Sequence, residues 1–364
     1  MSERLRVFAL ATYPVEAAAS RYRIVQFIDA LAARGIDVTF APFLDRELFD
    51  ALYSPRKLAL RSPRFALRLV RRLGDVLRAS RADVVWIQRE AMLFGPPVIE
   101  RLVRALGRPV VLDLDDATYI ASDSPVYGRL ATALKWPSKT DRLIRWSSAV
   151  IAGSDTVAAY VEAAGARATI VPTIVDLNVF TPRASDRTAP VVGWIGTHST
   201  YEFLRPLLPL LSDLGREHDF SLRIVGSGRE RIEIPHVRVE TKRWQLEDEV
   251  RDFQSLDIGL YPLVDDPFTR GKSGFKAIQY MAVGVPFVMS PVGVGATIGV
   301  EGRTHFLARD LDEWRAHLTT LLRDAEVRRG MGRAGREHAE AQYGLDEHAD
   351  RIANVLRSAA ARFA

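Results

Sequence analysis

The sequence predicts an α/β protein with two doubly wound, Rossmann-like domains in tandem, and three observations support this fold class. The chain has 364 residues, about twice the length of an average domain. Short apolar runs typical of buried parallel strands alternate with segments of helical periodicity. The alternation stops once, at residues 182–190 (PRASDRTAP), whose composition is that of a linker, and then begins again.

The first half of the chain has the strand order expected of βαβ units. A helix is predicted at residues 21–34, because Ile24, Ile28 and Leu31 recur at helical spacing and Gly35 follows. The predicted strands of this half are residues 5–9, 38–41, 84–88, 110–113, 150–152 and 169–172.

The second half repeats the pattern with strands at residues 191–195, 221–225, 258–261 and 286–290. Its predicted helices are residues 200–214, 274–282, 311–322 and 325–343. We therefore expect a first domain over residues 1–185, a second over 186–340, and a C-terminal helix over 341–364 that packs back on the first domain. Open α/β sheets bind ligands at the carboxyl ends of their strands, so two facing domains predict a ligand-binding cleft.

Composition excludes several classes of protein. The absence of cysteine excludes a disulfide scaffold, a thiolate metal site and a cysteine nucleophile. Apolar runs are too short for a signal peptide or a membrane span, which favours a cytoplasmic protein. Residues 1–185 hold 26 Lys+Arg against 19 Asp+Glu (net +7), whereas the remainder holds 24 against 26 (net −2). The first half is therefore expected to meet an anionic partner, and no nucleic-acid motif accompanies its charge.

The strongest chemical signal lies in residues 257–295. Ser273 is a plausible N-cap for the helix at residues 274–282, and Gly284 and Pro286 end that helix. Lys272, Lys276 and Gln279 are spaced i, i+4, i+7, so they share one helical face. Two lysines beside a helix N-terminus would stabilise a phosphate or pyrophosphate. The alternative is a short amphipathic helix with solvated lysines.

A second signal is the loop after the strand at residues 191–195. Ser199 and Glu202 have the spacing of a capping box, so Gly196, Thr197 and His198 would come just before a helix N-terminus. That position suits a donor phosphate or sugar. The alternative for His198 is an exposed loop histidine.

Polar side chains also follow the strands of the first half. Arg21 is predicted at a helix N-terminus, and Glu90 follows the strand at residues 84–88. Asp115 and Asp116 follow the next strand, after Asp113. Three interpretations of these acids are open. They could form a metal-binding DxD motif, or a phosphatase motif DxDx[TV], although Ala117 occupies the position of its threonine and Thr118 comes next. They could also form a metal-free cluster that pairs with Arg89 or binds acceptor hydroxyls. We favour the third.

The stretch GKSGFKAIQYMAVGVPFV (residues 271–288), followed by SPVGV, resembles the nucleotide-sugar site of GT-B glycosyltransferases of family 4. VVGWIGTHST (191–200) and SLRIVGSG (221–228) are similar to the strands of the second domain of that family. The family usually carries two glutamates eight positions apart, where this chain has Gly271 and Gln279. The resemblance implies that Gln279 holds the donor ribose, and it leaves the other role unassigned.

The resemblance also implies the reaction. Members transfer sugar from a nucleotide diphosphate sugar with retention of configuration, here a UDP- or GDP-sugar without a metal or other cofactor. Lysines and helix N-termini then stabilise the leaving diphosphate. The expected catalytic residues are Lys276, His198 and Asp116. The expected donor-binding residues are Gly196, Thr197, Lys272, Ser273, Gly274 and Gln279. Arg21, Glu90 and Asp115 are expected on the acceptor or phosphate side.

Residues 54–81 contain nine Lys and Arg and one acid, with leucines interspersed. A basic amphipathic helix is typical of membrane-surface binding, and residues 135–139 (KWPSK) offer a second contact. The alternative is an ordinary surface helix. Docking would place the protein at the inner face of the membrane, with a glycan, lipid or lipid-linked acceptor and a part in polysaccharide or glycolipid biosynthesis.

Two other functions stay open, a sugar-nucleotide epimerase and a non-catalytic nucleotide-sugar-binding partner that lacks the glutamate pair.

Overall fold

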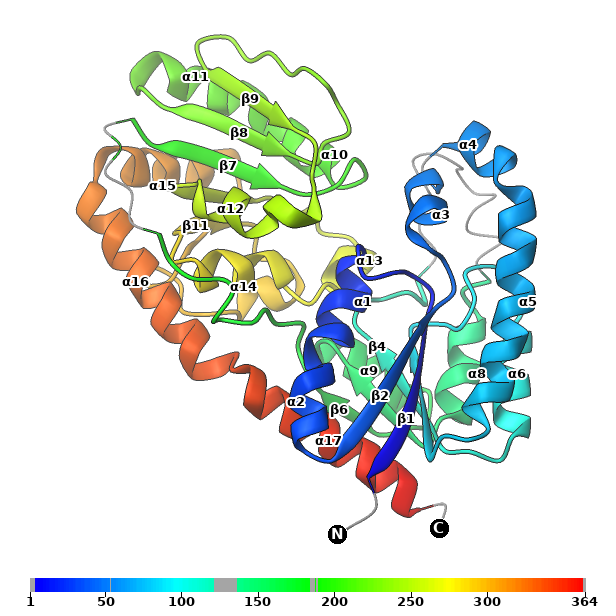
Figure 1. The fold of residues 1–364 in the computed structure, drawn as a ribbon. Coiled ribbons are helices and arrows are strands. Elements are labelled where there is room, and N and C mark those ends of the chain that lie inside the picture. The colour runs from blue at the N-terminus through cyan, green and yellow to red at the C-terminus, as the bar shows by residue number, and fades with distance from the viewer. Residues whose placement is uncertain (1–3, 53, 121–135, 184–186, 188, 363–364) are drawn as a thin grey trace. The chain divides into compact units, whose positions relative to one another are not determined.

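The computed structural model describes residues 4–52, 54–120, 136–183, 187 and 189–362 (Figure 1). The chain forms two compact units. The first unit comprises residues 1–173, 271–273 and 345–364, and the second comprises residues 174–270 and 274–344. By contacts the chain thus divides after Thr173, whereas the sequence pattern placed the division near residue 186.

The first unit contains a six-stranded sheet in the order β2-β1-β3-β4-β5-β6, with every pair of neighbours parallel. Its strands are β1 (Leu5–Ala11), β2 (Ile36–Pro42), β3 (Val84–Gln88), β4 (Val110–Leu114), β5 (Ala149–Ala152) and β6 (Ala168–Ile170). The order runs outward from β1 in both directions, which is the doubly wound arrangement that the sequence predicts.

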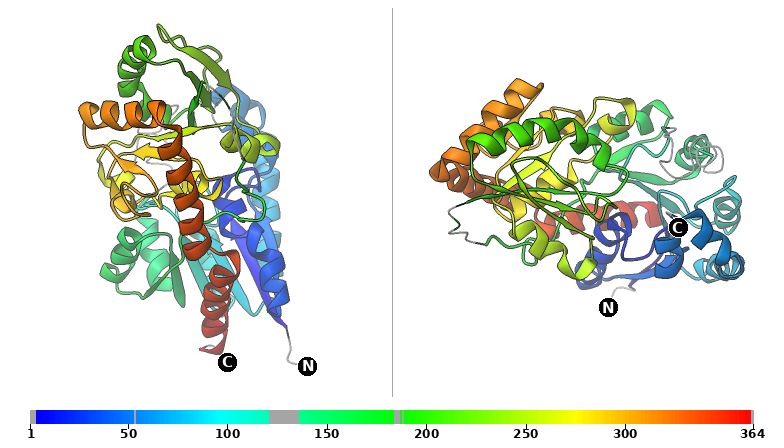
Figure 2. Two further views of the ribbon diagram at one scale, coloured as in Figure 1. Left: turned by 90° about the vertical axis from the view of Figure 1, so that its left-hand side faces the viewer. Right: turned by 90° about the horizontal axis from the view of Figure 1, so that it is seen from above.

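Helices cover both faces of this sheet. One face packs on α5 (Ser62–Ala79), α6 (Val98–Ala105), α8 (Lys139–Trp146) and α9 (Asp155–Ala163). The C-terminal helix α17 (Leu345–Ala361) contacts β3, β4, β5 and α2 (Ile28–Ala33). Figure 2 shows α17, in red, beside this sheet. Arg34 at the end of α2 pairs with Asp346 and Asp350 of α17 at 3.1 and 2.6 Å.

The single helix predicted at residues 21–34 is instead three short pieces. They are α1 (Ala18–Arg23), the 3-10 turn η1 (Val25–Phe27) and α2. Arg21 therefore lies in the last turn of α1, where a cation suits the helix dipole, and not at an N-terminus. Its guanidinium donates to the carbonyls of Val15 and Glu16, both at 2.9 Å, so this arginine stabilises its own loop.

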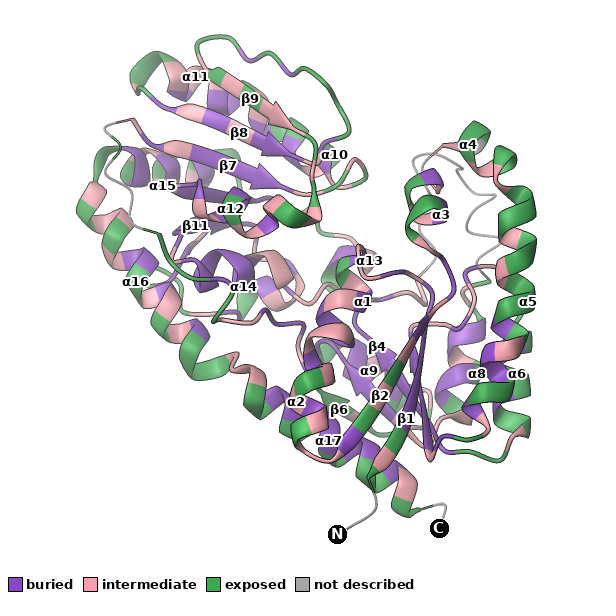
Figure 3. Cartoon of the chain, viewed as in Figure 1, coloured by how far each residue is buried: buried purple, intermediate pink, exposed green. Residues whose placement is uncertain are grey.

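The helix α5 turns two of its arginines, Arg68 and Arg72, toward the domain and its leucines toward solvent. Arg72 is fully buried and donates to the carbonyls of Ala41 and Ala11, at the ends of β2 and β1, at 3.0 and 2.7 Å. Arg68 donates to the carbonyls of Phe43, at 2.5 Å, and Pro42. The outward face of α5 is exposed along the helix (Figure 3). These two arginines of the basic segment satisfy carbonyls at the strand ends.

The second unit contains another parallel six-stranded sheet, in the order β12-β11-β10-β7-β8-β9. Its strands are β7 (Val191–Ile195), β8 (Ser221–Val225), β9 (Arg238–Lys242), β10 (Ile258–Tyr261), β11 (Phe287–Met289) and β12 (Phe306–Leu307). The edge strands β9 and β12 escape prediction because β9 alternates with charged residues and β12 has two residues. The prediction of two parallel α/β sheets is confirmed.

One face of the second sheet packs on α11 (Leu208–Glu217) and α15 (Leu311–Arg323) through leucines of both helices. The other face lies against α12 (Glu249–Gln254) and α14 (Phe275–Ala282). Tyr280 of α14 is buried there, and a Cβ at Gly259 of β10 would lie 2.7 Å from its ring. Glycine in the strand thus permits the close approach of α14.

The remaining helices are short, apart from α16 (Ala325–Gln342), which contacts α14. The short helices are α3 (Arg46–Ala51), α4 (Pro55–Leu60), α10 (Tyr201–Leu204) and α13 (Pro267–Arg270), and the 3-10 turns are η2 (Arg205–Leu207), η3 (Leu246–Asp248) and η4 (Gly293–Ala296).

The predicted capping box at Ser199 and Glu202 is wrong. Thr200 is the N-cap of α10 and makes no side-chain cap, while Glu202 pairs with Arg205 at 2.6 Å. Within the described parts of the chain, no helix is long and apolar enough to cross a bilayer.

Candidate functional site

The second sheet has its topological switch point between β7 and β10. From β7 the chain proceeds to β8 on one side and later to β10 on the other. Ligands of open α/β sheets bind beside such a point, at the carboxyl ends of the strands. The loop Gly196–His198 follows β7, and α14 with Lys276 and Gln279 follows β10. The predicted donor residues of this unit therefore flank its switch point.

The loops after β7 and β8 lie against each other because glycines allow it. Gly226 and Gly228 have φ angles of 82° and 72°. A Cβ at Gly226 would lie 2.2 Å from the carbonyl oxygen of Gly196, and one at Gly228 would lie 2.8 Å from the Cβ of His198. Burial lowers the pKa of His198, so its half-buried imidazole is neutral near pH 7. Thr197 is exposed.

A second group of predicted residues meets on α14. Lys276 Nζ donates to Gln279 Oε1 at 3.1 Å and lies 5.3 Å from the centre of the Phe253 ring. Gln279 Nε2 lies 3.4 Å from Oε1 of Glu249. Gln279 is fully buried and Glu249 is 4% exposed, whereas Lys276 is half-buried. Glu249 was not predicted as a site residue, because it belongs to an acidic run (residues 247–249) of the kind usually found on a solvated surface.

The start of α14 differs from its prediction. The N-cap is Gly274, with φ 68°, and no side chain caps the helix, so the assignment of Ser273 as N-cap is wrong. Glycine takes this left-handed position because it has no Cβ. Lys272 precedes the helix and does not share a helical face with Lys276 and Gln279. Lys272 and Ser273 belong to the first unit, in which the charge of Lys272 acts on Asp116.

The carboxylates after β4 form ion pairs within the first unit. Asp115 binds the Arg89 guanidinium through both oxygens, at 2.5 and 2.7 Å, and also accepts from Gln88 Nε2 at 3.1 Å. Burial opposes the charge of Asp115, but Arg89 outweighs burial, and the pKa of Asp115 is lowered. Asp116 lies 3.3 Å from Arg89, and burial raises its pKa against the opposing charge of Lys272. Asp115 and Asp116 thus both contact Arg89, which is one of the two arrangements that the favoured interpretation of these acids allows.

The third carboxylate, Asp113, forms a buried ion pair that stabilises the fold. It binds Arg23 of α1 at 2.7 Å, and each side chain is 1% exposed. Arg23 also donates to the carbonyl of Val171, which follows β6, at 2.6 Å. Burial raises the pKa of Asp113 even beside Arg23. This pair joins α1 to the middle of the sheet and is absent from the predicted site.

Glu90 also has an ion-pair partner. Lys139 Nζ lies 2.5 Å from its carboxylate, and Lys139 is 3% exposed. The predicted membrane contact at residues 135–139 is therefore wrong for Lys139, which the buried pair with Glu90 holds in the unit; Lys135 falls outside the described residues. The backbone carbonyl of Glu90 accepts from Thr12, so the loops after β1 and β3 meet at the switch point of the first sheet.

Gly271, which replaces a family glutamate, is buried against Ala117 in the first unit. A Cβ at position 271 would lie 2.4 Å from the Cβ of Ala117, which is itself fully buried. Ser154 Oγ lies 3.5 Å from the carbonyl of Gly271. The space that a larger side chain would need is thus already filled.

Gly271→Ala is expected to destabilise the first unit, because the added Cβ overpacks the contact with Ala117. We expect the free energy of unfolding to fall by about 1–3 kcal/mol, measured in urea. Adding Ala117→Gly should restore most of the loss. Gly74→Ala is the matched control, since nothing lies within 4 Å of a Cβ at this position in α5, and helix propensity favours alanine there. Equal effects of the two alanine variants would contradict the overpacking.

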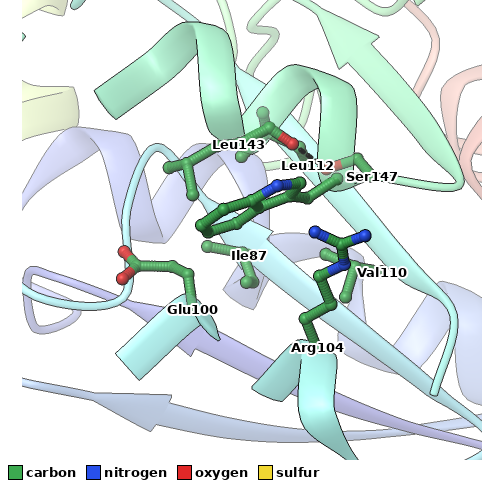
Figure 4. A pocket seen from close by; sticks show the side chains of 8 residues that line it. Ile87, Glu100, Arg104, Val110, Leu112, Leu143 and Ser147 are labelled. Carbon is green, nitrogen blue, oxygen red and sulfur yellow. Dashed lines mark hydrogen bonds between the residues drawn. The ribbon is translucent and has the colours of Figure 1, made fainter. Parts of the chain in front are cut away.

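A small pocket lies under α6 and α8 in the first unit (Figure 4). Ile87, Val110, Leu112 and Leu143 form its apolar lining. Two of its polar side chains are engaged: Glu100 accepts from the Ala91 N–H at 2.9 Å, and Ser147 donates to the carbonyl of Leu143 at 2.7 Å. None of the predicted site residues lines it. Within the described residues, no group of three His, Asp or Glu side chains is arranged to hold a metal ion.

Two Rossmann-like units with polar groups at their switch points are typical of a nucleotide-sugar-dependent transferase. Residues 21–179 match the family model described as Glycosyltransferase Family 4, and residues 189–324 match that of Glycosyl transferases group 1. The two matches span most of the chain. The protein belongs to the family 4 glycosyltransferases of GT-B fold, which confirms the predicted resemblance.

One curated relative comes from Corynebacterium glutamicum and is named GDP-mannose-dependent monoacylated alpha-(1-6)-phosphatidylinositol monomannoside mannosyltransferase. It is 29% identical over 155 residues, and the match covers 38% of this chain and 39% of the relative. This chain thus spans about two fifths of the length of the relative it matches.

Two solved structures share the fold over nearly the whole chain. Anabaena Alr3699/HepE in complex with UDP-glucose has a TM-score of 0.70 at 16% identity, covering 98% of this chain and 100% of that one. Sucrose-phosphate synthase from Thermosynechococcus elongatus has a TM-score of 0.69 at 15% identity, covering 99% and 100%.

Proposed function

We propose that this protein is a retaining glycosyltransferase that uses a nucleotide diphosphate sugar and transfers a hexose to a lipid or lipid-linked acceptor. The observation that carries the donor assignment is Lys276, a half-buried ammonium held at the switch point of the second sheet. A cation preorganised there would stabilise the charge that develops on the leaving diphosphate. Family membership supports the reaction class.

The loops after β7 and β8 supply the rest of the proposed donor site. Gly196 and Thr197 offer backbone close to the strand ends, where a phosphate can approach. The neutral imidazole of His198 can exchange hydrogen bonds with a sugar hydroxyl. Charge stabilisation by Lys276 in the second unit would need no metal ion. Asp116, whose pKa is raised by burial, is proposed to contact an acceptor hydroxyl in the first unit.

Thermal unfolding with UDP, GDP, ADP and CMP tests the donor site. We expect one diphosphate to raise the Tm, since a ligand at a hundred times its Kd stabilises by about 2.7 kcal/mol. Release of that nucleotide from its sugar conjugate then separates a transferase from a non-catalytic binder. No shift with any of the four would refute the donor site, and a shift without release would favour the binding partner.

The lipid acceptor is supported by the surface of α4 and α5. The side chains of Leu67, Val70 and Leu77 are 48, 66 and 72% exposed on the outward face of α5, and Leu60 of α4 is 81% exposed. The core-facing side of α5 holds Arg68 and Arg72 together with the buried Val76 and Ala79, so the exposed leucines and valine do not belong to the core. An exposed apolar stripe of this kind marks an interaction surface.

The charge on this surface supports an anionic bilayer as the proposed partner. Arg64, Arg71 and Arg78 are spaced by seven and follow one flank of the apolar stripe. Leucines that enter the interfacial region and arginines at the headgroups are the features of an interfacial helix, in which each basic residue adds about 1 kcal/mol on anionic lipid. The name of the corynebacterial relative, a transferase acting on a phosphatidylinositol mannoside, agrees with a lipid acceptor.

Co-sedimentation with vesicles tests the docking surface. We expect binding to phosphatidylcholine vesicles that contain phosphatidylglycerol, weaker binding as salt rises, and none to phosphatidylcholine alone. The triple variant L67S/V70S/L77S should lose at least about tenfold in affinity, because it removes the apolar contacts. Leu311→Ser is the control, because Leu311 is a leucine that is 53% exposed on α15, outside the docking surface. Wild-type affinity in the triple variant would overturn the docking surface.

A further inference from the structure

The buried carboxylate of Glu249 in the second unit has no role in the site described so far. It is the first residue of α12 and is 4% exposed. Burial of a carboxylate is costly unless charges or hydrogen bonds compensate for it. Gln279 Nε2 lies 3.4 Å from its Oε1, within the reach of a long hydrogen bond.

The orientation of the Gln279 amide is determined by its two neighbours. Its Nε2 faces the carboxylate of Glu249, and its Oε1 accepts from Lys276 Nζ at 3.1 Å. The flipped amide would put oxygen against a carboxylate and an NH2 group against an ammonium, and both contacts would repel. Glu249 therefore fixes which atom of Gln279 meets Lys276.

The same helix holds Lys276 from another side. Phe253 lies four residues after Glu249 in α12, is fully buried, and has its ring centre 5.3 Å from Lys276 Nζ. The Phe275 ring centre lies 5.9 Å from the same atom. Cation–π attraction and the amide oxygen thus restrict the ammonium, and α12 provides both Phe253 and the anchor of the amide.

We propose that Glu249 and Gln279 are positioning residues that hold the Lys276 ammonium toward the diphosphate of the donor; this rests on the donor site proposed above. A chain of carboxylate, amide and ammonium fixes the cation before substrate arrives, so no reorganisation is needed in the transition state. In this proposal the fully buried Gln279 acts through Lys276, in place of the ribose contact that the family resemblance implies.

The arrangement also accounts for an amide at position 279. A glutamate there would place a second carboxylate within about 3.4 Å of Glu249 in a buried site, and like charges so close are unfavourable. It would also pair directly with Lys276 and reduce the positive field that the diphosphate meets. In this chain the carboxylate belongs to Glu249, which contacts Gln279, and only the amide of Gln279 contacts Lys276.

Three variants test the proposal: Glu249→Gln, Gln279→Glu and the double exchange E249Q/Q279E. For Glu249→Gln we expect kcat to fall at least about tenfold, with little change in the KM of the acceptor, because the amide loses its fixed orientation. For Gln279→Glu we expect a fall in both Tm and kcat. The double exchange should recover Tm, since the two carboxylates no longer face each other, but not kcat.

Asp252→Asn is the matched control, because Asp252 is also buried on α12 but pairs with Lys242 at 2.5 Å. Wild-type kcat in Glu249→Gln, an equal loss of kcat in Asp252→Asn, or recovery of kcat in the double exchange would overturn the positioning role. Those outcomes require a wild-type protein that binds and turns over a donor. If the wild-type protein binds no nucleoside diphosphate, the proposed donor site itself fails.

Discussion

Lys276→Ala is expected to lower kcat of sugar transfer by about 10²–10³-fold, the effect of removing one preorganised group that stabilises developing charge. The ammonium lies at the carboxyl edge of the second sheet and is held by Gln279 at 3.1 Å and by the Phe253 ring. Release of nucleotide from a sugar nucleotide, followed by chromatography, measures the loss even before the acceptor is known.

The control for Lys276→Ala is Arg223→Ala in β8. Arg223 pairs with Glu240 of the neighbouring strand at 2.6 Å and lies outside the proposed donor site. Surface pairs of this kind contribute about 0–1 kcal/mol, so this variant should keep nearly full turnover. Equal turnover of the two variants would contradict the assignment of Lys276.

Asp113→Ala is expected to have the largest effect on stability. Removing the carboxylate leaves the Arg23 guanidinium, 1% exposed, without the ion that compensates its burial. Breaking a buried ion pair in this way costs about 3–5 kcal/mol, which equilibrium unfolding in urea measures. The carbonyl of Val171 alone does not offset a buried charge.

The double variant R23M/D113L distinguishes lost charge compensation from lost packing. Apolar replacement of both partners is often neutral or stabilising, so this variant should recover most of the loss. If Asp113→Ala costs less than about 1 kcal/mol, or the double variant is the less stable of the two, the pair does not carry the role we assign to it.

Most of the fold could be predicted because its strands are continuous apolar runs. Val84–Gln88, Val191–Ile195 and Ile258–Tyr261 have the predicted bounds, since both faces of a parallel strand are buried and the apolar run marks its length. The edge strand Arg238–Lys242 has no such run, because one of its sides meets solvent. Local helix signals failed where proline or tertiary contacts intervene, as between Tyr201 and Glu217.

The candidate site was predictable in part. Lys276 and Gln279 were found from helical spacing, and the structure joins them by a hydrogen bond. Glu249 was missed because its contact with Gln279 links residues thirty positions apart, and only the tertiary fold creates it. The pairing of Arg23 with Asp113 was not predicted for the same reason, since only the tertiary fold brings these two buried residues together.

A metal-independent diphosphate site in the second unit is the central element of the proposed function. Calorimetric titration of the full chain with UDP and GDP, in buffer that contains EDTA, tests this directly. We expect one of the two to bind with a Kd of about 1 mM or tighter, and Lys276→Ala to weaken that binding at least about tenfold, or 1.4 kcal/mol. No binding of either nucleotide, binding that requires Mg²⁺, or unchanged affinity in Lys276→Ala would contradict the account.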